Sequence, residues 1–176
     1  MKAICMYMNR TIFEISETPI TLGGSYGSED FLIDFGNIFI YDIADSVGDL
    51  NEEDEKSRIS ILFEKLSRDT GSSFQSQSEN DCASFILHSG FSEKYFKTRY
   101  EKFTECLENV RADLSLESFT KGVFWQRLWK LSNTYEDKYD DYVVFDGELY
   151  TLDSFLRNVT KPEKEYYIGS VLNYHS

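Results

Sequence analysis

Apolar residues gather in short runs near the start of the chain, and runs rich in β-branched and aromatic residues predict β-strands. Residues 2–8 are nearly all apolar, Asn9 and Arg10 form a suitable turn, and residues 11–15 read Thr-Ile-Phe-Glu-Ile. The two segments therefore predict an opening hairpin.

A second pair of apolar runs, 31–35 and 38–41, is separated by Gly36 and Asn37. This dipeptide accepts the positive φ angles of a tight primed turn, which makes it a strong hairpin signal. We therefore predict a second hairpin over 31–41.

The apolar spacing changes to that of a helix after Asn51, a residue that caps helices well. Four acidic residues fill the first turn, and apolar residues then recur at helical spacing: Ile59, Leu62, Phe63 and Leu66. The polar stretch 71–78 predicts a loop that joins two elements rather than two domains. A buried strand over 83–88 is expected to follow.

Two more helices are predicted in the middle of the chain. The first begins at Ser92 and has one continuous apolar face, formed by Phe96, Tyr100, Phe103, Leu107 and Val110. The second covers 118–131, and its apolar residues form a stripe with two tryptophans beside it: Phe124, Leu128 and Leu131, then Trp125 and Trp129.

The last forty residues predict a hairpin over 142–150 with an Asp146-Gly147 turn, a short helix over 152–159 capped by Thr151, and a final strand over 165–172. The order of elements lacks the regular βαβ alternation of a parallel sheet. We therefore predict a single α+β domain over residues 1–176, in which an antiparallel sheet of hairpins packs with three to four helices.

The composition is strongly acidic and limits the partners. The 176 residues include 31 Asp and Glu against 18 Lys and Arg, a formal net charge of -13. Such an excess repels phosphate backbones and anionic membrane surfaces, so neither nucleic acid nor a membrane is an expected partner. The apolar runs are also far shorter than the roughly 20 residues of a spanning helix. A basic protein is the natural partner of this charge.

Known catalytic and cofactor motifs give little support for an enzyme. The three cysteines are too widely spaced for a zinc site. The Gly-rich stretch 23–28 lacks the Lys of a phosphate loop and the Ser or Thr beside it that contacts phosphate and metal. Cys82 and His88 form one conceivable nucleophile pair. We expect no cofactor, no metal and no enzymatic activity.

Because Arg10 interrupts the apolar start before a signal sequence forms, a cytoplasmic location is expected.

Two acidic runs are the candidate binding residues. The first lies within 42–55 and includes Asp42, Asp45, Asp49, Glu52 and Glu53. The second mixes acids with tyrosines, which provide rigid contact area at low entropic cost, and includes Tyr135, Glu136, Asp137, Tyr139, Asp140, Asp141 and Tyr142. Helix-dipole stabilisation explains the acids at 52–55 without any partner, and a solvated loop explains the second run equally well.

These two runs, in a small acidic α+β chain, resemble the immunity proteins of bacterial toxin-immunity pairs, including those of contact-dependent growth inhibition. The resemblance implies a protein that binds a cognate basic toxin, expected to be a nuclease, and neutralises it by covering its active site or substrate-binding surface. It assigns no particular residue of this chain to the contact.

Three alternatives remain open. A phage-type anti-defence protein that mimics DNA would use the same negative charge. A small enzyme would require Cys82, His88 or buried carboxylates to converge in three dimensions. A structural subunit, whose charge serves only solubility, is favoured if an exposed apolar patch proves to be the largest contact surface.

Overall fold

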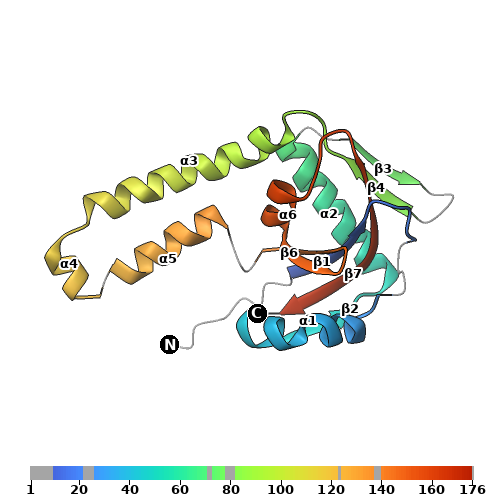
Figure 1. The fold of residues 1–176 in the computed structure, drawn as a ribbon, viewed down its shortest axis with the longest axis horizontal. Coiled ribbons are helices and arrows are strands. Elements are labelled where there is room, and N and C mark those ends of the chain that lie inside the picture. Colours follow the sequence, from blue (N-terminus) through green and yellow to red (C-terminus); the bar gives the residue numbers. More distant parts are fainter. Residues whose placement is uncertain are drawn as a thin grey trace.

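A mixed, mostly antiparallel sheet forms the centre of the protein (Figure 1). The structure is a computed structural model, and it describes residues 10–21, 26–70, 73–77, 82–122, 124–136 and 140–175. The strands are β1 (Arg10–Ser16), β2 (Ser46–Asp49), β3 (Ser73–Gln77), β4 (Cys82–Ile86), β5 (Tyr142–Phe145), β6 (Glu148–Thr151) and β7 (Glu165–His175). The helices are α1 (Ser28–Asp42), α2 (Glu52–Thr70), α3 (Phe91–Ala112), α4 (Leu116–Thr120), α5 (Phe124–Tyr135) and α6 (Leu152–Asn158).

The long strand β7 organises the sheet. The strand order is β3-β4-β7-β1-β5-β6, and β2 also pairs with β7. β7 is antiparallel to β1, β2 and β4, whereas β1 and β5 pair in parallel, with Ile12 opposite Tyr142. Because β1 and β5 are so far apart in sequence, their pairing is a non-local contact of the kind that slows folding.

Alternate residues of the central strands fill two separate cores. Phe13 on β1 and Val171 on β7 face a core covered by α2, α6 and the start of α3, while Ile12 and Leu172 face a second core covered by α1. This alternation is the period of two expected of a strand that is buried on both faces. α1 and the pair α2 and α6 thus lie on opposite sides of the sheet.

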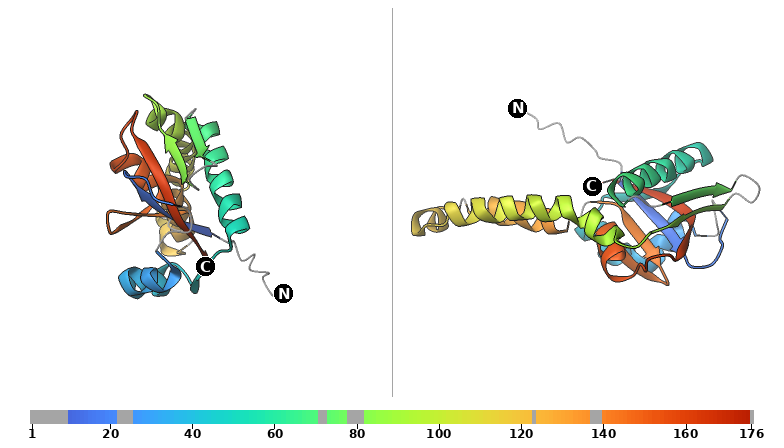
Figure 2. Two further views of the ribbon diagram at one scale, coloured as in Figure 1. Left: turned by 90° about the vertical axis from the view of Figure 1, so that its right-hand side faces the viewer. Right: turned by 90° about the horizontal axis from the view of Figure 1, so that it is seen from above.

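Residues 91–136, here called the arm, form a helical hairpin that projects from the sheet (Figures 1 and 2). α3 is about 33 Å long at 1.5 Å per residue, and α5 runs back along it. Phe91 and Tyr95, at the start of α3, belong to the first core, so the arm is attached at its root.

The structure confirms the α+β class and several predicted elements. The helices expected after Asn51 and near Ser92 are α2 and α3, and the strand over 83–88 is β4. The hairpin over 142–150 is β5 and β6, with φ of 51° at Asp146 and 74° at Gly147. α6 is capped as expected, because the Ser154 backbone N–H donates to the Thr151 hydroxyl at 3.1 Å.

The predicted hairpin over 31–41 is wrong, because these residues belong to the single helix α1. Its aromatic residues lie one turn apart and pack together: the Phe31 ring is 5.3 Å from that of Phe35 and 5.1 Å from that of Phe39. The Asp30 carboxylate accepts the Gly27 backbone N–H at 3.0 Å and closes the first turn. Burial of this aromatic face outweighs the weak helix propensity of Gly36.

Three further predictions need correction or lie outside the described residues. The polar stretch 71–78, predicted as a loop, contains β3, an edge strand that pairs with β4. The single helix over 118–131 is two helices, α4 and α5, with Gly122 between them at φ of 69°. Residues 11–15 form β1, but residues 2–8, the other half of the opening hairpin, lie outside the described residues. The described residues contain six helices rather than three or four, because 31–41 belongs to α1 and 118–131 is divided between α4 and α5.

Gly36→Ala is predicted to stabilise the protein. A Cβ at this position meets Leu32 side-chain atoms at 3.5 and 3.6 Å, which is ordinary contact, and Ala in a helix interior is favoured over Gly by about 0.5–1 kcal/mol. Urea unfolding measures the change. Gly147→Ala is the control and should be destabilised because of its positive φ. A destabilised Gly36→Ala would contradict the helix and favour a turn at this position.

Candidate functional site

The structure separates the two acidic runs predicted to bind a partner. The first run lies between α1 and the start of α2, whereas the second lies at the root of the arm, between α5 and β5. The two runs have opposite surroundings. Most of the first is exposed, and part of the second is buried against basic side chains.

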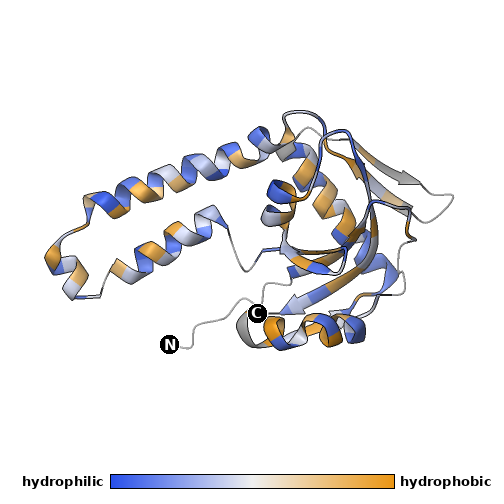
Figure 3. Ribbon diagram, in the orientation of Figure 1, coloured by the Kyte–Doolittle hydropathy of each residue, from blue (hydrophilic) through white to orange (hydrophobic). Residues whose placement is uncertain are grey.

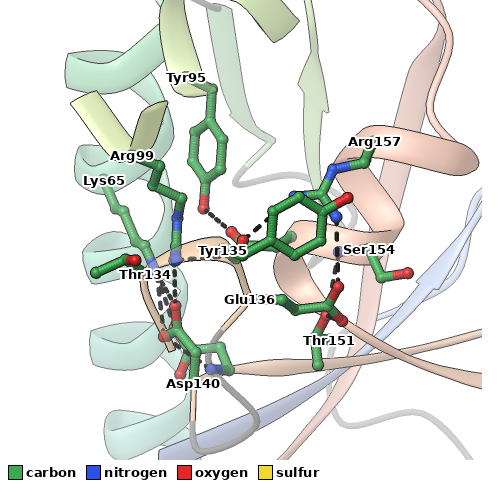
Figure 4. A network of polar contacts seen from close by, with 12 residues as sticks. Lys65, Tyr95, Arg99, Thr134, Tyr135, Glu136, Asp140, Thr151, Ser154 and Arg157 are labelled. Carbon is green, nitrogen blue, oxygen red and sulfur yellow. Dashed lines mark hydrogen bonds and ion pairs between the residues drawn. The ribbon is translucent and has the colours of Figure 1, made fainter. Parts of the chain in front are cut away.

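Asp140 is the centre of a buried ion-pair network (Figure 4). It is only 9% exposed, and its carboxylate accepts hydrogen bonds from Lys65 Nζ on α2 at 3.2 and 3.3 Å and from Arg99 Nη2 on α3 at 3.1 Å. Its backbone carbonyl accepts the Tyr174 hydroxyl at 2.7 Å. One residue therefore joins both long helices to β7.

Two more carboxylates extend this network. Asp153, at the start of α6, is 1% exposed, and its Oδ1 accepts the Tyr95 hydroxyl at 3.0 Å. Its Oδ2 lies 2.9 Å from Arg99 Nη1 as an ion pair without hydrogen-bond geometry. Asp141 accepts the Thr11 backbone N–H at 3.2 Å and lies 3.6 Å from Lys65 Nζ.

The three carboxylates have different pKa values because their partners differ. Burial alone would raise the pKa of Asp140, but Lys65, the Asp141 backbone N–H and Arg99 together hold this pKa below its ordinary value. Burial raises the pKa of Asp153, and Arg99 and Tyr95 offset this only in part. The pKa of Asp141 is also raised, by burial and by the neighbouring Asp140, despite the attraction of Lys65.

The other residues of the second run are distributed around this network. Tyr142 is buried in the second core. Tyr135 is more than half exposed and lies 4.5 Å from the Arg157 guanidinium, while Glu136 pairs with Arg157 at 3.3 Å. Asp137 and Tyr139 lie outside the described residues. Asp140 and Tyr142 were predicted to contact a partner, but both side chains are buried and are not available for such a contact. Asp140 is also already neutralised by internal cations.

The first run remains accessible. Asp45, Asp49, Glu52 and Glu53 are all exposed, and the side chain of Asp42 lies outside the description. The exposed acids of α1 join them: the Ser28 backbone N–H and hydroxyl donate to Asp49 at 2.7 and 2.8 Å, which holds the start of α1 against β2. We call this set the acidic face: Glu29, Asp30, Asp34, Asp45, Asp49, Glu52 and Glu53.

The acidic face has no basic residue within its own stretch of chain. Between Arg10 and Lys56 the sequence contains twelve Asp and Glu and not one Lys or Arg. Lys56 itself pairs with Glu52 at 2.5 Å one helical turn away. Capping accounts for Asp30 and Asp49, but Glu29, Asp45 and Glu53 make no side-chain hydrogen bond or ion pair among the described residues. The positions of Lys and Arg in the sequence already show this stretch without basic residues.

His88 lies in an arrangement that sequence reasoning missed. The Ser73 hydroxyl is 2.7 Å from His88 Nε2, and Glu163 Oε2 is 3.1 Å from His88 Nδ1, which are the distances of a nucleophile, base and orienting acid. All three side chains are largely exposed to water, and none of them lies in the cleft between α2, α3 and α5. The side chain of Cys82 lies outside the description. We therefore assign no reaction to this group.

The arm exposes several large apolar side chains. Figure 3 shows that hydrophobic and hydrophilic positions alternate along its helices. Trp125 is 70% exposed and Trp129 is 51% exposed, and Leu128 lies on the same face of α5. Leu128 was predicted to share one apolar stripe with Phe124 and Leu131, but Leu128 is exposed whereas Phe124 and Leu131 are half-buried. We call the exposed set Trp125, Leu128 and Trp129 the apolar stripe, as distinct from the predicted stripe of Phe124, Leu128 and Leu131. Leu114, Leu116 and Phe119 add further exposed apolar surface at the tip.

The described ranges contain neither a cluster of metal-ligating side chains nor a membrane-spanning helix. There, no three His, Cys, Asp or Glu side chains come together in a way that would hold a metal ion. No helix in the same ranges has the length and apolar character to cross a bilayer.

Asp140→Asn is predicted to destabilise the protein by about 2–4 kcal/mol at neutral pH, because it leaves Lys65 and Arg99 without their shared charge. The native pKa of Asp140 is lowered, so its contribution is present above the ordinary carboxyl pKa of about 3.9 and is lost as the pH falls through the native value. Urea unfolding at several pH values should show the two proteins converging under acid conditions. Glu53→Gln, at an exposed site, is the control, and an equal loss in both variants would contradict the network.

Known protein families, curated proteins and solved structures give no match to this chain, so its function has to be argued from its own residues.

Proposed function

We propose that this protein is an inhibitor of the immunity type, which binds a basic protein through the acidic face and neutralises it. One observation carries the proposal: exposed carboxylates from α1, β2 and the start of α2 gather on one face, within a stretch of chain that has no Lys or Arg. The resemblance to immunity proteins of toxin-immunity pairs points the same way.

The charge is distributed unevenly, which supports a contact at this face. The arm contains eight Lys and Arg and seven Asp and Glu, so the remaining residues carry ten basic against 24 acidic side chains. Carboxylates concentrated in this way repel one another and destabilise the fold, so a role in binding would explain why they are kept together. They attract a cationic protein over a long distance and accelerate its association.

The same face explains how binding would neutralise a partner. A nuclease binds its anionic substrate through a positively charged surface. An acidic face that occupies this surface excludes the substrate without any chemistry of its own. The exposed Ile33 and Ile38 on α1 lie beside these acids and would add apolar contact to the complex.

Neutralising three free carboxylates is predicted to slow association. In the triple variant Glu29→Gln, Asp45→Asn and Glu53→Gln, the on-rate for the partner should fall by about threefold to tenfold at low salt, and its salt dependence should weaken. Surface plasmon resonance measures both. The matched control, Glu93→Gln, Glu101→Gln and Glu105→Gln, makes the same change in charge on exposed positions of the arm and should leave the on-rate nearly unchanged.

The partner for this test is the product of the reading frame adjacent to this gene. Expressed alone, it should arrest bacterial growth, and coexpression of this chain should restore growth. Coexpression of the triple variant should restore less growth than the control variant. A neighbouring product without toxicity, or equal protection by both variants, would count against the inhibitor.

A second function, that of an assembly subunit, is favoured by the apolar stripe on the arm. Exposed patches of several hundred Å² that include tryptophan are typical of protein contacts. The occupant that fits best is a second copy of this chain. The arm is almost neutral, so two arms can approach closely, while two acidic bodies repel each other. Two antiparallel hairpins packed face to face would form a four-helix bundle.

Removal of the stripe is predicted to abolish this assembly. Trp125→Gln with Trp129→Gln should convert a dimer into a monomer in sedimentation equilibrium, with little change in the melting temperature because both side chains are exposed. Tyr100→Gln, which removes an exposed aromatic residue from α3, should remain dimeric. A wild-type protein that is monomeric at high micromolar concentration would rule the subunit function out.

A further inference from the structure

A cleft at the root of the arm has the opposite charge to the rest of the protein. It has a volume of about 730 Å³ and lies between α2, α3 and the end of α5. This volume falls within the range of about 300–1,000 Å³ that is typical of small-ligand sites. Its lining contains no Asp or Glu among the described residues: Lys65, Arg68, Lys94, Tyr95, Thr98, Arg99, Lys102, Asn133 and Thr134.

Five of these residues are cations, and two helices bring them together. Lys65 and Arg68 lie one turn apart on α2, while Lys94 and Lys102 lie two turns apart on α3 with Thr98 between them. In a chain with a net charge of -13, such a concentration of positive charge is not a general property of the surface.

The buried network below the cleft fixes two of the five cations. Asp140 holds Lys65 and Arg99, and Asp153 holds Arg99, so these side chains have little freedom to move. Lys65 remains 24% exposed and Arg99 23% exposed, so both can still contact a ligand in the cleft. Figure 4 shows both side chains converging on Asp140 from their helices. A site whose donors are already held in place binds with less loss of entropy.

Lys94 and Lys102 are not accounted for by the fold. Neither has an acidic partner within the described part of the chain. Arg68 lies in the last turn of α2, where the helix dipole favours a cation, and Lys65 is paired with Asp140. Lys94, in contrast, lies in the first turn of α3, where the dipole disfavours a positive charge. A bound anion would offset both the dipole and the repulsion between these lysines.

We propose that this cleft binds a ligand that carries two or more linked phosphate groups. Asp140, Asp141 and Asp153 pair with Lys65 and Arg99, whereas Lys94 and Lys102 keep uncompensated charges among the described residues, so the excess suits a multiply charged anion better than a single carboxylate. Lysine and arginine are the usual phosphate-binding side chains, and Thr98 and Asn133 add a hydroxyl and an amide. The site is separate from the acidic face and does not depend on the inhibitor function.

The test is isothermal titration calorimetry with inorganic tripolyphosphate at low salt. The wild-type protein should bind one equivalent in a saturable manner. Lys94→Gln with Lys102→Gln should weaken binding by about tenfold or more, since both charge-assisted contacts are lost. The matched control, Lys97→Gln with Lys130→Gln, removes two exposed arm lysines outside the cleft and should bind within about twofold of wild type. Melting temperatures verify that every variant is folded.

Three comparisons identify the ligand class. Tighter binding of ATP than of tripolyphosphate would support the site and indicate a nucleotide ligand. Equal affinities would support a site that contacts only the phosphate groups. Citrate, a trianion without phosphate, should bind much more weakly. Equal binding of citrate, equal losses in the two variant pairs, or no saturable binding of tripolyphosphate would each overturn the proposal.

Discussion

The ion pairs of Asp140 are the interaction on which the rest of this structure depends. Its carboxylate contacts Lys65 on α2 and Arg99 on α3, and Arg99 also reaches Asp153 at the start of α6. Three helices and the segment that leads into β5 are therefore joined at one point. Because water is largely excluded there, each charge requires its partners, and loss of one partner leaves the others buried without compensation.

This network also gives the protein two surfaces of different character. It attaches the nearly neutral arm to an acidic body, and it places a cluster of cations at their junction. The acidic face lies around α1, β2 and the start of α2, in a stretch of chain that has no Lys or Arg between Arg10 and Lys56, and Lys56 pairs with Glu52. A cationic macromolecule and a phosphate-bearing ligand would accordingly bind at different places on one small protein.

Much of the fold was predictable wherever the signal was local. α2, α3 and α6 have a clear apolar face or a capping residue, and the Asp146-Gly147 turn defines the β5–β6 hairpin. α1 was missed because its apolar runs fit a strand as well as a helix. What decides between the two is the packing of Phe39 against Phe31 and against Tyr174, and Tyr174 is more than 130 residues away. The break at Gly122 was missed for a similar reason, since the helix turns back only to let α5 pack on α3.

By itself, the sequence determined the acidic excess, the α+β class and the helices with a periodic apolar face, because charge and local spacing are properties of the chain alone. Tertiary structure decided which carboxylates are available to a partner. Asp45 and Asp140 are the same residue type, and both occur in acidic runs, yet one is exposed and the other is enclosed by Lys65 and Arg99. That difference depends on residues distant in sequence, which meet only when the helices pack on the sheet.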